Sequence, residues 1–393
     1  MIKESSFFKT AMLFILLITM VVGLSFISNR IWSGKPEKQL ESNELIIKND
    51  MTVFQFGQAN NLPNPALKEI FNLQAKSDLQ KSLSEYGTPD QIRFMVTGKK
   101  SIASEYESKN WKKIALKFLL WFVFLTTIFF TFKKRKVTSQ IRKLVLFACV
   151  IIFGVIMGSD PGPMGTVKDA IALFGMSREI FPPRLIAMTV FLLIVFVVNK
   201  YICAWGCQAG TLHDLIFRLN QNDKQNSVIG RQIKLPFVVT NTIRLVFFLV
   251  FTLIVFLWSY DIIELVDPFK IFKPAHLGII GSVFVGGLLV CSLFIYRPWC
   301  HLFCPFGLAG WLVEKVSRVK ISVNYDTCIA CNKCAKACPS TVMSAILKRD
   351  KKTIPDCFAC YTCRDVCPTN SISFSTRKRT MPPAGHFDKV KKE

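Results

Sequence analysis

Residues 328–339 read CIACNKCAKACP, and residues 357–368 read CFACYTCRDVCP. Both fit C-x2-C-x2-C-x3-C-P, in which three closely spaced cysteines wrap around one [4Fe–4S] cluster and the fourth ligates a second cluster. The closing proline has a fixed φ and no N–H, so it ends the ligand loop. The spacing therefore predicts a two-cluster domain with crossed ligand sets. One set is Cys328, Cys331, Cys334 and Cys367, and the other is Cys357, Cys360, Cys363 and Cys338.

Structural zinc is the competing interpretation of these eight cysteines. A zinc site uses four ligands, usually arranged as two spaced pairs. A triplet that is repeated in tandem, with proline after the fourth cysteine both times, does not follow that pattern. We therefore favour iron–sulfur clusters.

The whole chain has 393 residues, 51% of them hydrophobic, and its mean hydropathy is positive. This composition is too apolar for an ordinary soluble domain and indicates a membrane protein with soluble attachments. The net charge is +24. Since many Lys and Arg residues flank apolar runs, we interpret the excess as facing an anionic membrane surface. No soluble domain with a basic face stands out, which argues against nucleic-acid binding.

Six apolar stretches are long enough to cross a bilayer, which takes about 20 helical residues. Arg244 and Arg297 fall near the ends of the last two, from which we expect their side chains to reach the interface. The first stretch starts like a signal peptide, but its apolar run continues past Gly23, so we expect an uncleaved anchor. The stretches lie near residues 8–28, 114–132, 142–159, 184–202, 237–260 and 276–297.

Loop charges set the orientation, because Lys and Arg collect in cytoplasmic loops. The loops after the second and fourth stretches are strongly basic, whereas those after the third and fifth hold few cations. We therefore expect a bacterial inner-membrane protein with both termini in the cytoplasm and residues 30–113 on the outer face. Within that outer segment, Met51–Gln58 and Pro65–Leu73 have the spacing of two short helices. A small helical cap is expected there, with a docking module for an outer partner as the alternative.

Two parts of the membrane region resemble each other. In each, an apolar stretch ends at Asp-Pro, an outer loop follows, and a second apolar stretch leads into C-x3-C and then Gly. This common order predicts a duplicated two-span unit, related by an axis along the membrane normal. The cysteine pairs are Cys203 with Cys207, and Cys300 with Cys304.

These four cysteines are candidate metal ligands. Residues four apart share one face of a helix, so each pair would present two thiolates together. Because both pairs lie at the cytoplasmic ends of repeat-related helices, symmetry can bring all four sulfurs into one site. We hypothesise a further metal centre, either an iron–sulfur cluster that relays electrons or a copper ion, with His301 as an extra candidate ligand. The alternative is two reduced or reactive thiol pairs without a metal.

The other residues with ligating side chains suggest no second kind of cofactor. Cys149 and Cys291 lie inside spans and are expected to behave as small hydrophobes. No two histidines pair at helical spacing within a span, and no nucleotide-binding glycine motif is present. Asp160 and Asp267 stand near the outer ends of spans. We expect solvated helix ends there, with binding of a quinol headgroup as the alternative.

Repeated spans that end in C-x3-C, followed by a two-cluster tail, resemble the NapH/NosR family of membrane-bound polyferredoxins. The resemblance covers roughly residues 114–372. It implies electron transfer between the quinone pool and a soluble or outer-face redox partner, although some relatives serve metal-centre assembly, including copper reduction. Family pairs usually read C-x3-C-P, and here Pro305 follows Cys304 but Gln208 follows Cys207. The outer segment also lacks the motif that attaches covalent flavin in some relatives.

Together these observations predict an all-α membrane protein with six transmembrane helices and a C-terminal α+β two-cluster ferredoxin domain. The predicted function is electron transfer between a quinone, or another membrane donor or acceptor, and a redox partner protein. We expect a subunit of an oxidoreductase system rather than a stand-alone enzyme; the alternative is a metal-centre assembly or copper-reducing maturation factor. The expected divisions are an anchor (1–29), an outer helical segment (30–113), the transmembrane region (114–318), the ferredoxin domain (319–375) and a basic tail (376–393).

Overall fold

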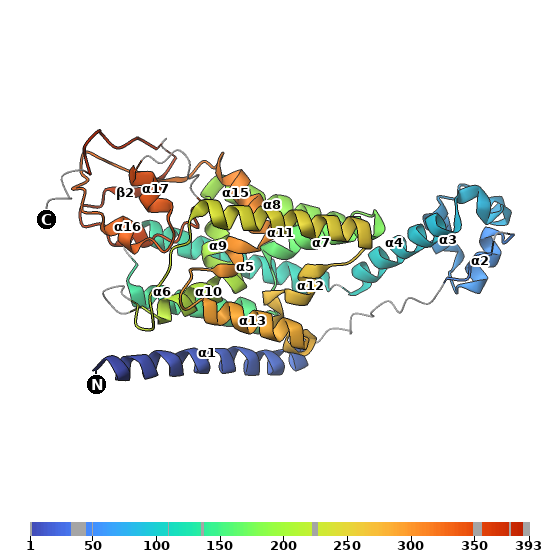
Figure 1. Ribbon diagram of the computed structural model, residues 1–393. Helices are drawn as coiled ribbons and strands as arrows, with labels where there is room; N and C mark the ends of the chain where they lie inside the picture. The colour runs from blue at the N-terminus through green and yellow to red at the C-terminus, as the bar shows by residue number, and fades with distance from the viewer. Residues whose placement is uncertain are drawn as a thin grey trace.

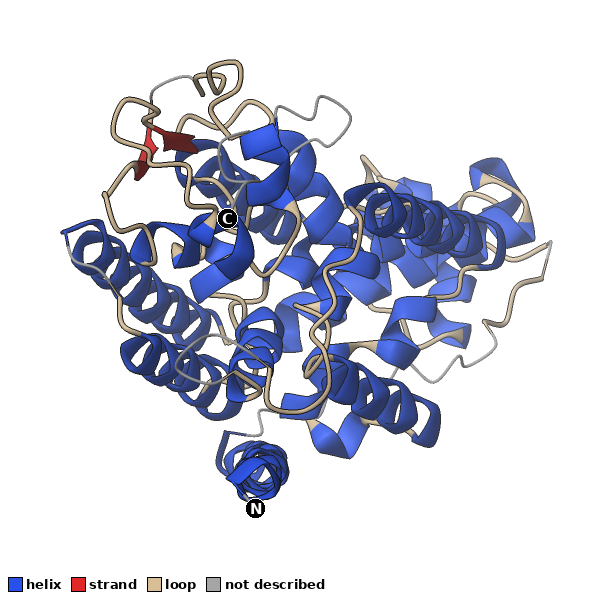
Figure 2. Ribbon diagram, turned by 60° about the vertical axis from the view of Figure 1, so that its left-hand side comes forward, coloured by secondary structure: helices blue, strands red, loops and turns tan. Residues whose placement is uncertain are grey.

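A computed structural model describes residues 2–32, 45–48, 50–108, 110–134, 137–221, 227–348, 356–376 and 379–387. The longer helices lie side by side along the long dimension of the molecule (Figure 1). The cysteine-rich C-terminal part, which begins at Lys320 and is hereafter called the tail, lies at one end of this bundle together with the N-terminus. The small helical segment before α4 lies at the opposite end. In the part of the chain described, named strands occur only in the tail (Figure 2).

Four stretches among the described residues are long and apolar enough to cross a membrane. Two further apolar helices are shorter, α8 (Pro182–Val198) and α13 (Ile279–Cys291). The last predicted span, 276–297, is therefore helical only in its middle. The four longer stretches belong to α1 (Ile2–Trp32), α5 (Trp111–Lys134), α6 (Ser139–Cys149) with the π-helical η3 (Val150–Ile156), and α11 (Phe237–Trp258).

The segment before the second span has a hydrophobic core of its own, built around Val53, Phe56 and Leu67. Both short helices expected there are present, and Thr52 and Gln55 form a capping box at the start of the first. A third helix, α4 (Pro89–Ser108), was not predicted, because its polar composition gives a weak periodic signal. The elements are α2 (Val53–Ala59), α3 (Asn64–Phe71), the 3-10 turns η1 (Lys76–Gln80) and η2 (Leu83–Tyr86), and α4 (Pro89–Ser108).

Short helices fill the space between the spans. Two of them, α10 (Gln208–Leu219) and α15 (Pro305–Glu314), begin directly after a C-x3-C pair. Helix α10 packs against α6 and η3, whereas α15 packs against α7 and α8. The other short elements are α7 (Pro163–Ser177), α9 (Tyr201–Trp205), α12 (Ile262–Val266), η4 (Pro268–Phe272), η5 (Pro274–His276) and α14 (Pro298–Leu302).

The tail is a small α+β unit. Strands β1 (Lys320–Val323) and β2 (Ile372–Ser375) pair antiparallel, so the two ends of the unit meet in one ladder. Side chains that include Ile321, Met343 and Ile372 form a core beneath the ladder. Three short helices complete the unit, α16 (Lys333–Ala337), α17 (Val342–Lys348) and α18 (Thr362–Asp365).

Gly175 of α7 allows a close approach to α11, and a side chain there should destabilise the fold. A Cβ atom at this position would lie 2.3 Å from Cγ1 of Val255. Valine is stiff at χ1 and Val255 is fully buried, so we expect Gly175→Ala to lower the unfolding free energy by about 1–3 kcal/mol. Thermal unfolding in detergent measures this. Gly286→Ala, where a Cβ meets nothing within 4 Å, is the control and should not lower the midpoint.

Candidate functional site

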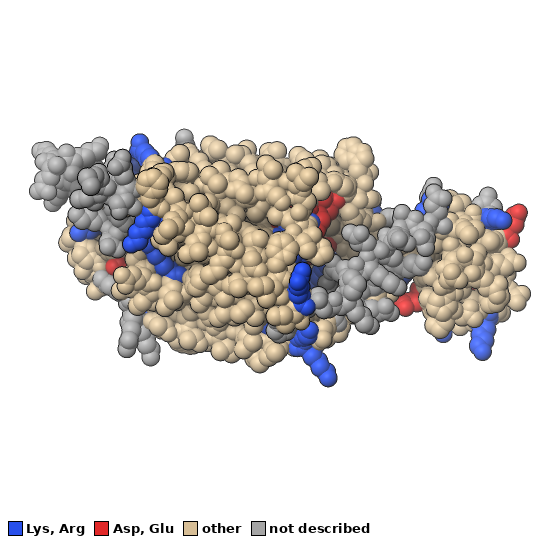
Figure 3. Space-filling view, turned by 90° about the horizontal axis from the view of Figure 1, so that it is seen from below, with Lys and Arg blue, Asp and Glu red and all other residues tan. Residues whose placement is uncertain are grey.

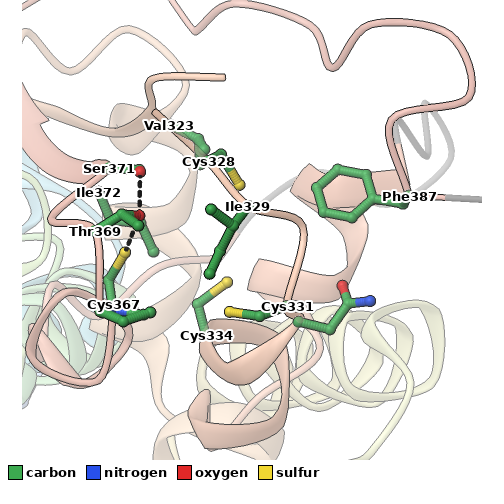
Figure 4. Close-up of a pocket in the computed structure, with 12 residues that line it drawn as sticks. Val323, Cys328, Ile329, Cys331, Cys334, Cys367, Thr369, Ser371, Ile372 and Phe387 are labelled. Carbon is green, nitrogen blue, oxygen red and sulfur yellow. Dashed lines mark hydrogen bonds between the residues drawn. The ribbon is translucent and has the colours of Figure 1, made fainter. Parts of the chain in front are cut away.

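The first predicted ligand set surrounds one cavity in the tail. Cys328, Cys331 and Cys334 come from the loop before α16 and from α16 itself, and Cys367 follows α18. Their sulfur atoms lie around a common hollow, with Ile329 among them (Figure 4). The structure thus brings the first triplet together with the last cysteine of the second motif.

The second predicted set surrounds another cavity. Its lining includes Cys338, Cys357, Cys360 and Cys363, together with the aromatic ring of Phe358. Each cavity therefore takes three cysteines from one motif and the fourth from the other. The pairing of β1 with β2 makes this exchange geometrically simple, because the strands flank the two motifs and hold their ends together.

The two ligand loops share an unusual backbone. Ala330 and Asn332 in the first loop have φ of 56° and 54°, and Ala359 and Tyr361 in the second have φ of 53° and 60°. Non-glycine residues seldom adopt positive φ, least of all a bulky tyrosine. Alternation of left-handed and ordinary residues curls a loop and turns its N–H groups inward, which suits an anionic group. The N–H of Ala359 donates to Sγ of Cys357 over 3.4 Å.

The pKa values of the tail thiols show what the cavities require. Burial, then the neighbouring thiols, raises the pKa of Cys334 to about 11. Burial also raises the pKa of Cys338 and Cys363. Burial acts to raise the pKa of Cys367 too, but hydrogen bonds from Thr369 and nearby backbone N–H groups outweigh it and lower that pKa. Cys334, Cys338 and Cys363 therefore need a bound metal to become thiolates, and its binding releases their protons.

The donor set fits an iron–sulfur cluster better than a single metal ion. A tetrahedral zinc with Zn–S bonds of 2.3 Å places its sulfurs about 3.8 Å apart. The tail cysteines form two C-x2-C-x2-C triplets, each joined at its cavity by a fourth cysteine from the other motif, rather than the two spaced pairs of a zinc site. A [4Fe–4S] cluster, with iron and sulfide at alternating corners of a cube and one thiolate on each iron, spreads its four thiolates more widely. The two four-cysteine cavities therefore suit cubane clusters.

The C-x3-C cysteines are all buried in the helical bundle. The two pairs lie close together, because Arg297, three residues before Cys300, donates hydrogen bonds to the carbonyl oxygens of Cys203 and Ala204. The i, i+4 spacing predicted that the two cysteines of each pair share one face of a continuous helix. The structure shows no continuous helix through either pair. Instead α9 and α14 end between the paired cysteines, and Cys207 and Cys304 are the N-cap residues of α10 and α15. In the second pair, Pro305 accounts for the break, because it disfavours helical backbone at the preceding residue.

Two helix N-termini therefore point at this four-cysteine group, which we call the core thiol group. The N-terminus of a helix carries partial positive charge and free N–H donors. The N–H of Gly307 donates to Sγ of Cys304 over 3.3 Å. Both features favour thiolates and other anions at this position.

Buried cations surround the core thiol group. Arg297 donates to the carbonyl oxygens of Cys203 and Ala204, the latter over 2.8 Å. Arg244 donates to the carbonyl oxygen of Cys300 over 3.4 Å. Lys200 is fully buried and pairs with Asp356 of the tail and, at 3.7 Å, with Glu314.

This finding corrects the expectation that Arg244 and Arg297 reach the interface. Their exposed fractions are 1% and 0%, and both form ion pairs inside the protein. One sequence signal was available, because Lys200 and Arg297 each stand three residues before the first cysteine of a pair. The ion pairs around these thiols form three groups, and in two of them cations outnumber carboxylates, which favours an anionic centre nearby. Lys200 and Arg244 pair with Glu314 and Asp356, Arg218 and Arg297 pair with Asp214, and Arg142 and Arg364 pair with Asp365.

The tail docks on this network through its second ligand loop. Phe358 is 4% exposed, and its ring centroid lies 4.2 Å from Nζ of Lys200 and 4.9 Å from the ring of His301. Nε1 of Trp205, inside the first C-x3-C pair, donates to the carbonyl oxygen of Ala359 over 3.2 Å. Arg142 donates to the carbonyl oxygen of Cys360 and pairs with Asp365. The second tail cavity therefore lies beside the core thiol group.

The two remaining cysteines take no part in these sites. Cys149 is buried in α6, and its sulfur accepts a weak hydrogen bond of 3.6 Å from the Thr211 hydroxyl. Cys291 is exposed at the end of α13. Neither lines the tail cavities.

Comparisons with known proteins agree with this chemistry. Residues 321–374 match a family described as a 4Fe–4S dicluster domain. Residues 180–235 and 277–324, which contain the C-x3-C pairs, match a family described as a 4Fe–4S binding domain. The chain is similar to YccM of Escherichia coli strain K12, whose name describes an electron transport protein. The two are 30% identical over 182 residues, which is 43% of this chain and 49% of YccM.

The chain thus spans about half the length of the curated relative it matches. No solved structure matches the chain. The family matches and the cysteine arrangement support an iron–sulfur protein of electron transfer, and the long apolar helices are consistent with a membrane protein.

The crossed ligand sets can be tested by pairing variants. We expect Cys367→Ser to abolish or alter the same EPR signal as Cys331→Ser, because both side chains line the first cavity. Cys338→Ser should affect the same signal as Cys360→Ser. Low-temperature EPR of anaerobically reduced protein is the measurement. Agreement of Cys338→Ser with Cys331→Ser instead would contradict the crossed arrangement.

Proposed function

We propose that the protein carries electrons between the membrane and a redox partner protein. It would hold two [4Fe–4S] clusters in the tail and a further metal centre at the core thiol group. Clusters of this kind supply reversible one-electron transfer when bound. In the proposed path, electrons pass between three centres. The core thiol group is the first, the cavity of Cys338 and Cys357 is the second, and the cavity of Cys328 is the last.

One observation carries this proposal: the second ligand loop is buried against the core thiol group. A tail that only stored clusters would not need to insert Phe358 between Lys200 and His301. Trp205 links the two sites directly. It lies between Cys203 and Cys207, and its Nε1 donates a hydrogen bond to the backbone of the second ligand loop. Redox centres that exchange electrons need such a fixed, close and water-poor contact.

The proposal includes six spans built from a duplicated unit. Helices α8 and α13 are shorter than a full span, but each continues into a C-x3-C segment and then a short helix. The 4Fe–4S binding family matches once around each pair, which supports duplication. The tail and the N-terminus share one end of the bundle, and the small helical segment lies at the other (Figure 1). This arrangement is the one expected if both termini lie on the same side of the membrane; the proposal adds that this side is the cytoplasm, that the membrane is a bacterial inner membrane, and that the chain has the five divisions predicted above.

Membership of the NapH/NosR family would make a quinone the membrane partner. Asp267 is the stronger of the two acidic candidates for that role. Burial raises the pKa of Asp267 to about 6, and its carboxylate caps the backbone at Phe269. Asp160 is half exposed and pairs with Lys117 at 2.9 Å. A partly buried carboxyl group with a pKa of about 6 is suited to accept a proton released by a quinol.

The quinol hypothesis predicts a distinct pH dependence. Between pH 5 and 7, the quinol oxidation rate should rise as the Asp267 carboxylate forms, and Asp267→Asn should remove this rise. Asp160→Asn is the matched control and should leave it in place. Steady-state oxidation of a short-chain quinol by the purified protein, with ferricyanide as the terminal electron acceptor, measures both. An unchanged profile in Asp267→Asn would rule out this role for the residue.

Iron analysis tests the number of centres. If the core thiol group holds a four-iron cluster, anaerobically purified protein contains about twelve irons per chain, and a variant with Cys203, Cys207, Cys300 and Cys304 all replaced by Ala contains about eight. The variant should also lose one EPR signal. The double variant Cys149→Ala/Cys291→Ala is the control and should keep all the iron.

Other results would contradict parts of the proposal. About eight irons in both proteins would mean that the core thiol group holds no four-iron cluster. Copper bound by the wild type and lost from the quadruple variant would favour the maturation factor. Zinc in place of iron would refute the two-cluster tail.

A further inference from the structure

The two ligand loops have the same backbone but opposite surroundings. Ile329 and Phe358 occupy the same position, directly after the first cysteine of each motif. Phe358 is 4% exposed, whereas Ile329 is 61% exposed. We propose that the exposed loop around Ile329 is the docking surface for a soluble, acidic, one-electron carrier protein. The proposal rests on the function proposed above and names its partner.

The buried loop shows what such a contact requires. The helical bundle receives the second loop by packing around the aromatic ring of Phe358, and Lys200 and Arg297 lie over that ring. The first loop presents the same apolar projection beside its own cysteines, and in the described chain it does not contact the core thiol group in this way. An aliphatic side chain at the centre of a polar rim is a common anchor in protein interfaces.

The rim of the exposed loop is basic. Lys333 and Lys336 of α16 are exposed next to Cys334. Of the three carboxylates in the described tail, Asp356 and Asp365 pair with cations of the membrane region, so only Asp326 remains at the surface. Several Lys and Arg side chains gather at the tail end of the face in Figure 3.

The positive charge around the Ile329 loop favours an acidic protein as the docking partner. A second copy of the chain would bring the same cations to the contact and be repelled, whereas an acidic protein is attracted and steered to the loop. Cys328 and Cys331 of this loop line the first cavity, so a protein that docks here lies next to the cluster proposed for it. Because such a cluster transfers one electron at a time, we expect the partner to be a one-electron carrier. A flavodoxin has both properties and serves as the probe.

Binding of flavodoxin to the full-length protein in phosphatidylcholine nanodiscs tests the surface directly. We expect Lys333→Glu to raise Kd about tenfold at low ionic strength, with a smaller effect at high salt. Lys348→Glu changes the net charge equally at the end of α17, away from this loop, and is the control. Ile329→Ser should raise Kd at all salt concentrations, because its contribution is apolar.

Two readouts separate the docking surface from the proposed function. EPR must first show the same tail signals in every variant, so that a changed Kd reports the surface and not a lost cluster. Equal effects of Lys333→Glu and Lys348→Glu, or no measurable binding of flavodoxin, would overturn the docking proposal. Normal binding without stopped-flow electron transfer to flavodoxin would leave the surface in place and refute the electron-transfer function instead.

Discussion

The ion pairs between Asp356 of the tail and two cations of the membrane region, Lys200 and Arg244, hold the structure's two parts together. All three side chains are buried. Removing a charge from water costs several kcal/mol, and a buried charge is tolerated only when a partner offsets that penalty. Without this contact Asp356 would lose both of its cations, and Arg244 would lose its carboxylate partner. The tail is thus fixed in one orientation, with its second ligand loop against the core thiol group.

The same constraint joins the two C-x3-C segments. Lys200 precedes the first pair and lies 3.7 Å from Glu314, which belongs to the helix after the second pair. Arg297 precedes the second pair and lies 2.8 Å from Asp214, in the helix after the first pair. Each segment supplies a cation to the other, so the four cysteines between them are brought together. The excess positive charge and two helix N-termini make this position favourable for an anionic centre.

Cysteine spacing predicted the grouping in the tail, because the ligand pattern is local and the motif is repeated. The core thiol group was predicted for a partly wrong reason. A helix at i, i+4 spacing was expected, but the chain breaks between the cysteines, and Pro305 marks that break only in the second pair. The buried roles of Arg244 and Arg297 were missed because an arginine near a span end normally reaches water. Their partners, Asp356 and Asp214, are distant in sequence and invisible to any local pattern.

The two repeated ligand loops have nearly the same backbone. Their side chains must therefore determine which loop faces the helical bundle and which faces water. The two loops match in the left-handed residues that shape them, Ala330 with Ala359 and Asn332 with Tyr361. They differ in what they present to their surroundings: Phe358 and the buried Thr362 in one loop, Ile329 and the exposed Lys333 in the other. Aromatic and neutral residues let the second loop enter a cation-lined pocket, where a lysine would be repelled. The lysine of the first loop keeps it in water and makes it available to another protein.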